Sequence, residues 1–297
     1  MLFRSLMMKF KPRAAIAAIA AGFGALALAS AAQAFPIYEP ITVFEDDNLE
    51  YLSLDANTNG NLDVGDQLRG VVDFTKIYGA FGGGPTDLGA PELTALFELQ
   101  VSSKVATATP GKFNFTFAPT AGFTATYGAG AMVAVFEDPS DDLQTIGTPC
   151  ASIAACETAA TNGTHVLTLG FNDADDFWLT SDAVESFAAV AGLPAATKVG
   201  FNNYLLSILF NNTPYTWNQQ DASGVYALLG LACADDCLVD VIGSGDSLGG
   251  QGLTNGYQAR SDIDAQIAFI PEPGALGLAG LALAGLGLAR RRRSIAR

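Results

Sequence analysis

The segment DANTNGNLDVGD, residues 55–66, carries the side chains with the clearest potential for chemistry. Oxygen-bearing side chains occupy its positions 1, 3, 5, 7, 9 and 12: Asp55, Asn57, Asn59, Asn61, Asp63 and Asp66. Gly60 stands at position 6, where the chain can turn sharply, and Leu62 at position 8 could point inward. Carboxylate and amide oxygens are the ligands that Ca²⁺ takes in proteins. The spacing therefore predicts a calcium-binding loop.

This pattern resembles the D-x-[DN]-x-[DN]-G loop of EF-hand and dockerin-like proteins. One departure is Asp66, which stands where those loops carry a glutamate and is too short to be expected to bind the ion through both oxygens. Three of the six candidate ligands are neutral asparagines, which lowers the charge of the site. The resemblance thus implies weak binding, suited to extracellular calcium at about 10⁻⁴ to 10⁻³ M.

The same segment also predicts a simple turn. Asn59-Gly60 between two strand-like runs, 41–54 and 69–77, is a strong β-hairpin signal. A calcium loop flanked by strands instead of helices would satisfy both interpretations, so both remain open at this point.

The sequence does not support a serine hydrolase, because it offers no base that could activate the serine. Gly245-Asp246-Ser247-Leu248 resembles the block of the GDSL esterases, but no histidine follows Ser247. The chain contains one histidine, His165, in a context unlike that of serine hydrolases, and a serine without a base is not activated. We therefore expect a flexible turn at 243–250 and no catalytic residue. Paired carboxylates of a glycoside hydrolase remain an alternative, because thirty acidic residues leave many pairs open.

Four cysteines predict two local disulfides. Cys150 and Cys156 enclose five residues, and Cys233 and Cys237 enclose three. A four-cysteine zinc site is the rival interpretation, but it lacks the usual C-x-x-C spacing. Each predicted disulfide closes a short loop, so its contribution to stability should be modest.

The elements that must hold these residues are mostly strands. Short segments bounded by Gly, Pro or Asp predict antiparallel strands at 41–54, 69–77, 94–101, 112–117, 122–127, 131–136, 164–171 and 262–270. Asp182 as N-cap, Glu185 three residues later and Gly192 with Pro194 as a stop predict one helix. Asp173, Asp175 and Asp176 predict a solvated turn, with a second cation site as the alternative; 201–210 and 223–242 fit a strand or a helix. The expected fold is mainly β: a single antiparallel β-sandwich-like domain with one or two short helices.

The N-terminus reads as a signal peptide, residues 1–34. Arg4, Lys9, Lys11 and Arg13 precede an apolar run, and Ala32-Gln33-Ala34 supplies the small residues of a signal peptidase site. A retained N-terminal anchor is the alternative. Cleavage would leave Phe35 as the first residue of the mature chain.

The C-terminus, residues 271–297, has three parts. Pro271-Glu272-Pro273 is followed by sixteen apolar residues, 274–289, and then by Arg290, Arg291, Arg292 and Arg293. As a helix the apolar run is about 24 Å long, against a hydrocarbon core of roughly 30 Å, so it predicts a short transmembrane helix. The arginines should stay on the cytoplasmic side, which places the body outside.

The order of tripeptide, apolar run and arginine cluster resembles the PEP-CTERM sorting signal; an ordinary single-span anchor is the alternative. The resemblance implies export, transient anchoring in the inner membrane, cleavage by an exosortase, and release to the cell surface or extracellular matrix. It further implies a structural or binding role in exopolysaccharide, biofilm or floc cohesion.

The net charge of the body limits the kinds of partner that it can bind. Residues 35–273 contain six basic residues against all thirty acidic ones, a net charge of −24. Such a surface repels nucleic acid and attracts divalent cations. The apolar content of the chain predicts a globular body at 35–270. Alternative functions for this body are a carbohydrate-binding module that uses exposed Trp178, Trp217 or tyrosines, and the glycoside hydrolase named above.

Overall fold

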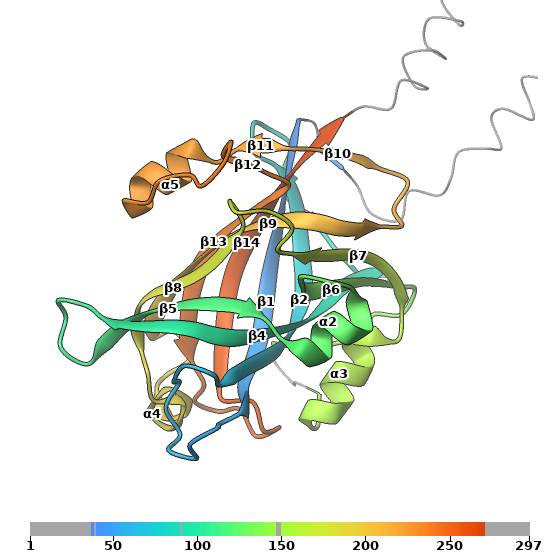
Figure 1. The fold of residues 1–297 in the computed structure, drawn as a ribbon. Helices are drawn as coiled ribbons and strands as arrows, with labels where there is room; N and C mark the ends of the chain where they lie inside the picture. Colours follow the sequence, from blue (N-terminus) through green and yellow to red (C-terminus); the bar gives the residue numbers. More distant parts are fainter. Residues whose placement is uncertain (1–36, 39, 90, 147–149, 271–297) are drawn as a thin grey trace, which may run out of the picture. The chain divides into compact units, whose positions relative to one another are not determined.

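A computed structural model describes residues 37–38, 40–89, 91–146 and 150–270. Figure 1 shows a body of long strands, with short helices at its margins. The predicted signal peptide and the predicted C-terminal helix fall outside the described residues.

Fourteen strands are present in the described residues, twelve of them in one antiparallel sheet. The sheet contains β1 (Ile41–Leu54), β2 (Gln67–Gly79), β3 (Thr86–Asp87), β4 (Glu92–Ala106), β5 (Lys112–Pro119), β6 (Ala131–Asp138), β7 (Thr164–Gly170), β8 (Phe177–Val184), β9 (Lys198–Asn211), β10 (Thr216–Asn218), β13 (Val241–Gly249) and β14 (Ala259–Ile270). The other two strands, β11 (Gln220–Asp221) and β12 (Leu238–Val239), pair with each other.

The large sheet closes on itself. Each of β1, β2, β4, β6, β7, β9, β13 and β14 pairs with the next, and β1 in turn pairs with β14. Two long strands each serve two neighbours: β4 pairs with β6 and then with β5, and β9 pairs with β8 and then with β7. Closure places two walls of strands face to face around one core, which confirms the predicted mainly-β, sandwich-like fold.

Aromatic side chains fill this core. Phe115 and Phe117 of β5 are buried, and Trp178 packs against Tyr204 with 4.6 Å between ring centroids. Gly243 of β13 lies opposite Tyr204, and a Cβ at this glycine would come within 2.0 Å of the tyrosine ring. The glycine therefore makes room for the ring, since any side chain would displace it.

Four short helices occur in the described residues, where one or two were expected: α2 (Ala121–Tyr127), α3 (Ile153–Thr161), α4 (Phe187–Gly192) and α5 (Ser223–Leu229). The first of them corrects the prediction of a strand at 122–127. Thr120 caps α2 by accepting a hydrogen bond from the N–H of Phe123 at 3.1 Å, and the ring of Phe123 is buried. A capped helix that buries one aromatic ring thus overrides a strand pattern of only six residues.

The predicted helix at 182–192 begins later than expected. Asp182 lies in β8, whose residues pair with β9 from Phe177 to Ser181, and its φ angle is 48°. Ser186 is the N-cap, accepting a hydrogen bond from the N–H of Ala189 at 3.3 Å. Beyond Ser181, Ala183 and Val184 pair with β5, so strand pairing takes the residues that resemble a helix start.

Candidate calcium loop and sorting signal

The 55–66 loop joins β1 to β2, so strands flank it on both sides. Gly60 has a φ of 73°, the left-handed conformation that its position requires, and Leu62 is buried as predicted. The loop lies against the start of α4, because the N–H of Leu62 donates to the carbonyl of Glu185 at 2.7 Å and the N–H of Phe187 donates to Gly60 at 3.0 Å. The segment is thus a structured loop docked on the body.

The carboxylates at the two ends of the loop hold its backbone. Asp55 accepts hydrogen bonds from the N–H groups of Asn59 at 3.3 Å and Gly60 at 2.7 Å. Asp66 is buried and accepts from the N–H of Ala56 at 2.8 Å and of Asp63 at 2.7 Å. These bonds draw the first and last candidate ligands toward the middle of the loop.

Asp63 is the centre of the loop's charge. The side-chain amides of Asn57 and Asn59 both donate to its Oδ2 at 2.8 Å, and the ammonium of Lys104 donates to its Oδ1 at 2.6 Å. The bond from Lys104, followed by those from the two amides, lowers the pKa of Asp63 to about 2. Lys104 also forms an ion pair with Glu185. The loop therefore already has a cation beside one candidate ligand, in the form of this ammonium group.

The six candidate ligands are of the chemical types that calcium binds. Their present arrangement, however, is not that of a calcium site. Three carboxylates supply negatively charged oxygens and three side-chain amides supply neutral ones, and Ca²⁺ takes oxygen ligands of both kinds. For calcium to bind, Lys104 would have to leave Asp63, and the amides of Asn57 and Asn59 would have to turn their oxygens inward. Asn61 forms a β-bridge with Ser186, which fixes its backbone. Sequence reasoning missed Lys104 and Glu185, and no local signal could have found them, because both lie far along the chain from the loop.

The serine block at 245–248 is a strand. It belongs to β13, and Ser247 accepts a hydrogen bond from the amide of Asn202 at 2.8 Å, which corrects the expectation of a flexible turn. His165 lies on β7 and stacks on Phe210 with ring centroids 4.9 Å apart. Ser247 pairs with Gly200 near one end of β9 while Phe210 lies near the other end, roughly 30 Å away along the strand. The structure does not bring this serine and this histidine together.

Trp178, the first aromatic candidate for sugar binding, is buried. Trp178 is only 6 % exposed and lies among Phe97 and Tyr204 in the interior. The cavity beside it has a volume of about 50 Å³, enough for a few water molecules but not for a sugar ring. This corrects the expectation that Trp178 is exposed. Trp217 of β10 is partly exposed.

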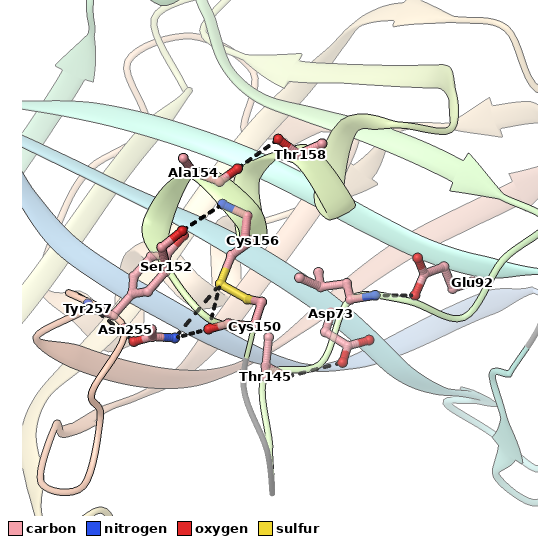
Figure 2. Close-up of a disulfide and its surroundings, with 12 residues drawn as sticks. Asp73, Glu92, Thr145, Cys150, Ser152, Ala154, Cys156, Thr158, Asn255 and Tyr257 are labelled. Atoms are coloured by element: carbon pink, nitrogen blue, oxygen red, sulfur yellow. Dashed lines mark hydrogen bonds between the residues drawn. A yellow bond between two sulfur atoms is a disulfide. The ribbon is translucent and has the colours of Figure 1, made fainter.

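Both predicted disulfides form, Cys150–Cys156 and Cys233–Cys237. In Figure 2 the first disulfide joins the start of α3 to the segment before it, and Asn255 donates to the carbonyl of Cys150 at 3.1 Å. The disulfide therefore joins α3 to the segment before it, and Asn255 links that segment to the loop that precedes β14.

The second disulfide loop closes around a buried carboxylate. Asp175 accepts hydrogen bonds from the N–H groups of Ala234 at 2.6 Å, Asp235 at 3.0 Å and Cys237 at 2.7 Å. Asp176 is also buried, and Ser207 donates to it at 2.9 Å. The predicted solvated turn at 172–176 is therefore wrong for these two aspartates: they are anchors that face inward.

The C-terminal end of the described body is a central strand. β14 pairs with β1 on one side and β13 on the other, and its last residues pair with β10, Trp217 opposite Phe269 and Thr216 opposite Ile270. Pro271, Glu272 and Pro273 follow at once and lie outside the described residues, as do the predicted transmembrane helix and its arginines. Among the described residues, no helix is long and apolar enough to cross a membrane.

Comparison with known proteins identifies the tail of the chain. Residues 269–293 match the family described as the PEP-CTERM protein-sorting motif. A search of curated proteins finds no match to the chain. The match begins at Phe269, so the motif overlaps the last two residues of β14. The chain therefore carries a PEP-CTERM sorting signal, which marks it as an exported protein that an exosortase sorts from a membrane-anchored precursor.

Proposed function

We propose that the mature chain is a structural or binding protein of the cell surface or extracellular matrix, where it takes part in exopolysaccharide, biofilm or floc cohesion. Export and sorting follow from the motif; the role in cohesion is the proposal.

The observation that best supports it is the direct passage from β14 into the motif. β14 is paired on both sides, so the residues that precede the cleavage region belong to the core of the sheet. The sorting signal therefore carries the whole folded body, with no linker that would release a separate piece. A body delivered intact and outside the cell is suited to a structural role.

Calcium is the cation that we propose supports this role, through the 55–66 loop. The loop offers six candidate ligands, and the body carries a large excess of negative charge. Divalent cations bridge acidic proteins and anionic polysaccharides, which would otherwise repel each other. A dissociation constant of about 10⁻⁴ to 10⁻³ M would let the loop fill in millimolar calcium outside the cell and stay empty where free calcium is far below that range.

The test is a deletion of the gene in the producing bacterium. We expect loss of floc or biofilm cohesion and of matrix-bound polysaccharide, restored by the wild-type chain but not by a chain in which Pro271, Glu272 and Pro273 are replaced by alanine. Cosedimentation of the purified protein with isolated exopolysaccharide, with and without about 1 mM calcium, checks the physical interaction. Unchanged cohesion in the deletion strain would overturn the proposal.

We propose no catalytic role. The support is that Ser247 and His165 lie near opposite ends of β9, which leaves this serine without a base. Release of reducing sugars from the isolated polysaccharide would contradict this and favour the glycoside hydrolase.

A further inference from the structure

Three acidic side chains meet at the ends of β4 and β6. Glu92, the first residue of β4, lies directly opposite Asp138, the last residue of β6. Asp142 comes from the loop that follows β6, and one carboxylate oxygen from each of the three residues lies within 4.8 Å of the others. Glu92 is 2 % exposed and Asp138 is 4 % exposed, whereas Asp142 is open to solvent. The three carboxylates therefore extend from the protein interior to its surface.

One oxygen of Glu92 is buried and lacks a partner. Glu92 accepts a hydrogen bond from the N–H of Leu143 on Oε2 at 3.3 Å, but its Oε1 has no hydrogen-bond partner among the described residues. A buried carboxylate oxygen that is left unsatisfied costs free energy comparable to a lost hydrogen bond or more. An ion that binds this oxygen would remove that cost.

No positive side chain compensates the three carboxylates. The ion pairs of the described residues involve Arg69, Lys76, Lys104 and Lys198, and none includes Glu92, Asp138 or Asp142. Like charges directly opposite each other on paired strands are destabilising, more so when buried. The fold thus concentrates negative charge here without neutralising it.

We propose that Glu92, Asp138 and Asp142 bind a calcium ion. Ca²⁺ takes only oxygen ligands at 2.3–2.6 Å, so ligands on opposite sides of the ion are about 5 Å apart, and the observed spacing falls within this limit. Water supplies the remaining ligands on the exposed side, next to Asp142. The exported chain meets calcium outside the cell. This site is separate from the 55–66 loop and does not depend on it.

Neighbouring contacts hold the loop that carries Asp142. The amide of Asn162 donates to the Asp142 carboxylate at 3.0 Å, and Thr145 donates to Asp73 at 3.1 Å. In Figure 2 Glu92, Asp73 and Thr145 lie near the Cys150–Cys156 disulfide. Leu143, which is fully buried, anchors the loop between the two contacts. The ligands are therefore positioned before the ion arrives.

The experiment is a thermal unfolding series on the full-length chain purified in detergent, in EDTA and in CaCl2, together with calorimetric titration by CaCl2. Glu92→Gln and Asp142→Asn test the site, and Asp55→Ala is the matched control in the other loop. We expect calcium to raise the Tm of the wild type and of Asp55→Ala. Glu92→Gln and Asp142→Asn should each weaken calcium binding at this site by at least about 10- to 100-fold. A loss of this size is usual when a metal site loses an outer-shell partner.

A second readout separates loss of a ligand from loss of fold. In EDTA, Glu92→Gln should melt at or above the wild-type Tm, because it removes one charge of a buried repulsive pair. A calcium-induced rise in Tm that Glu92→Gln and Asp142→Asn retain in full would overturn the proposal. So would a rise that Asp55→Ala alone abolishes, since calcium would then bind only the 55–66 loop.

Discussion

The backbone N–H of Phe269 donates a hydrogen bond to the carbonyl of Pro40 at 3.0 Å. One residue on, Ile41 pairs with Ala268, so the first strand and the last strand of the body lie side by side at this end. The predicted signal peptidase site is five residues before Pro40, and the PEP tripeptide is two residues after Phe269. The described residues nearest the two predicted processing sites therefore lie at the same end of the sheet.

Replacing Pro271, Glu272 and Pro273 by alanine should block processing without unfolding the body. β14 ends at Ile270, so the substitutions fall outside the sheet. Immunoblots of membrane and medium fractions should show the variant as a full-length membrane form, while the wild type loses its tail. Release of the triple variant at the wild-type rate would mean that another sequence directs cleavage.

Lys104→Met should strengthen calcium binding to the 55–66 loop. The ammonium of Lys104 lies 2.6 Å from Asp63 Oδ1 and competes with an ion for this ligand. The Lys104 nitrogen also lies 4.6 Å from the centroid of the Phe113 ring, a contact that methionine replaces by packing its thioether on the same ring. A unit charge at 4 Å is worth about 1 kcal/mol even in water, so we expect affinity to rise at least about fivefold.

The measurement is calorimetric titration with CaCl2 in a Glu92→Gln background, which removes the signal of the other proposed site. Lys104→Arg, which keeps the charge, is the control and should bind as the parent does. Equal affinity in the Met and Arg variants would show that Asp63 is not a calcium ligand.

Trp178→Ala should destabilise the body without affecting carbohydrate binding. The indole is buried between Phe97 and Tyr204, so its removal leaves a large cavity, and losses of about 3–5 kcal/mol are usual for such changes. Denaturant unfolding measures the loss, and Trp217→Ala, at a partly exposed position, should cost less. A glycan-binding defect in a Trp178 variant of wild-type stability would contradict the buried assignment.

Asp175→Asn should weaken the fold around the second disulfide. The carboxylate accepts three backbone hydrogen bonds from 234–237, and an amide can accept them only by placing its NH₂ group against another donor. Although burial opposes it, these bonds lower the pKa of Asp175. Because the pKa of Asp175 is lower in the folded state than in the unfolded state, its ionised carboxylate stabilises the fold at pH values above the unfolded-state pKa. This stabilisation is lost as the pH falls through the folded-state pKa.

The Tm of Asp175→Asn at neutral pH should fall below that of Asp235→Asn, a control at an exposed position on the same loop. Exchange of the backbone amides at 234–237 should also become faster. If the two variants melt together, the three hydrogen bonds contribute nothing to stability.

Sequence patterns were sufficient where local signals and tertiary structure agree. β1 has the bounds that its alternation predicts, 41–54, and each short-range disulfide was the simplest pairing of its cysteines. The order of charges and apolar residues in the tail is a linear signal, so the sorting motif could be recognised without any fold.

The same patterns failed where strand pairing decided the outcome. Asp182 has a residue type and spacing suited to a helix cap, but its two neighbours pair within the sheet, Ser181 with β9 and Ala183 with β5. Ser247 was expected in a turn because of the glycines around it, yet those glycines allow close approach of β14, where a Cβ at Gly245 would lie 1.9 Å from Asp262 O. The pairing of Glu92 with Asp138 likewise joins residues 46 positions apart, which no local spacing encodes.

A row of aspartates crosses the outer face of the sheet and makes stability depend on pH. Asp47 of β1 lies opposite Asp73 of β2, and Asp262 of β14 lies opposite Asp246 of β13. Burial, then Asp262, Asp73 and Glu45, raise the pKa of Asp47 from 3.8 to about 6, and Lys76 opposes them only in part. The pKa of Asp262 is raised as well, by burial and by its acidic neighbours.

We therefore expect the body to become more stable as the pH falls from about 7 to about 5. Because the native pKa of Asp47 lies above the unfolded value, the folded state binds the proton more tightly, and its stabilising effect is complete at low pH and is lost as the pH rises through about 6. Asp262→Asn removes the largest charge acting on Asp47, so it should raise the Tm at pH 7 and flatten the pH dependence, whereas Asp235→Asn should change neither. Thermal unfolding in EDTA between about pH 5 and pH 7 measures the effect, with EDTA present to exclude cation binding. A Tm that falls on acidification over this range would show that the aspartate row does not control the stability of the sheet.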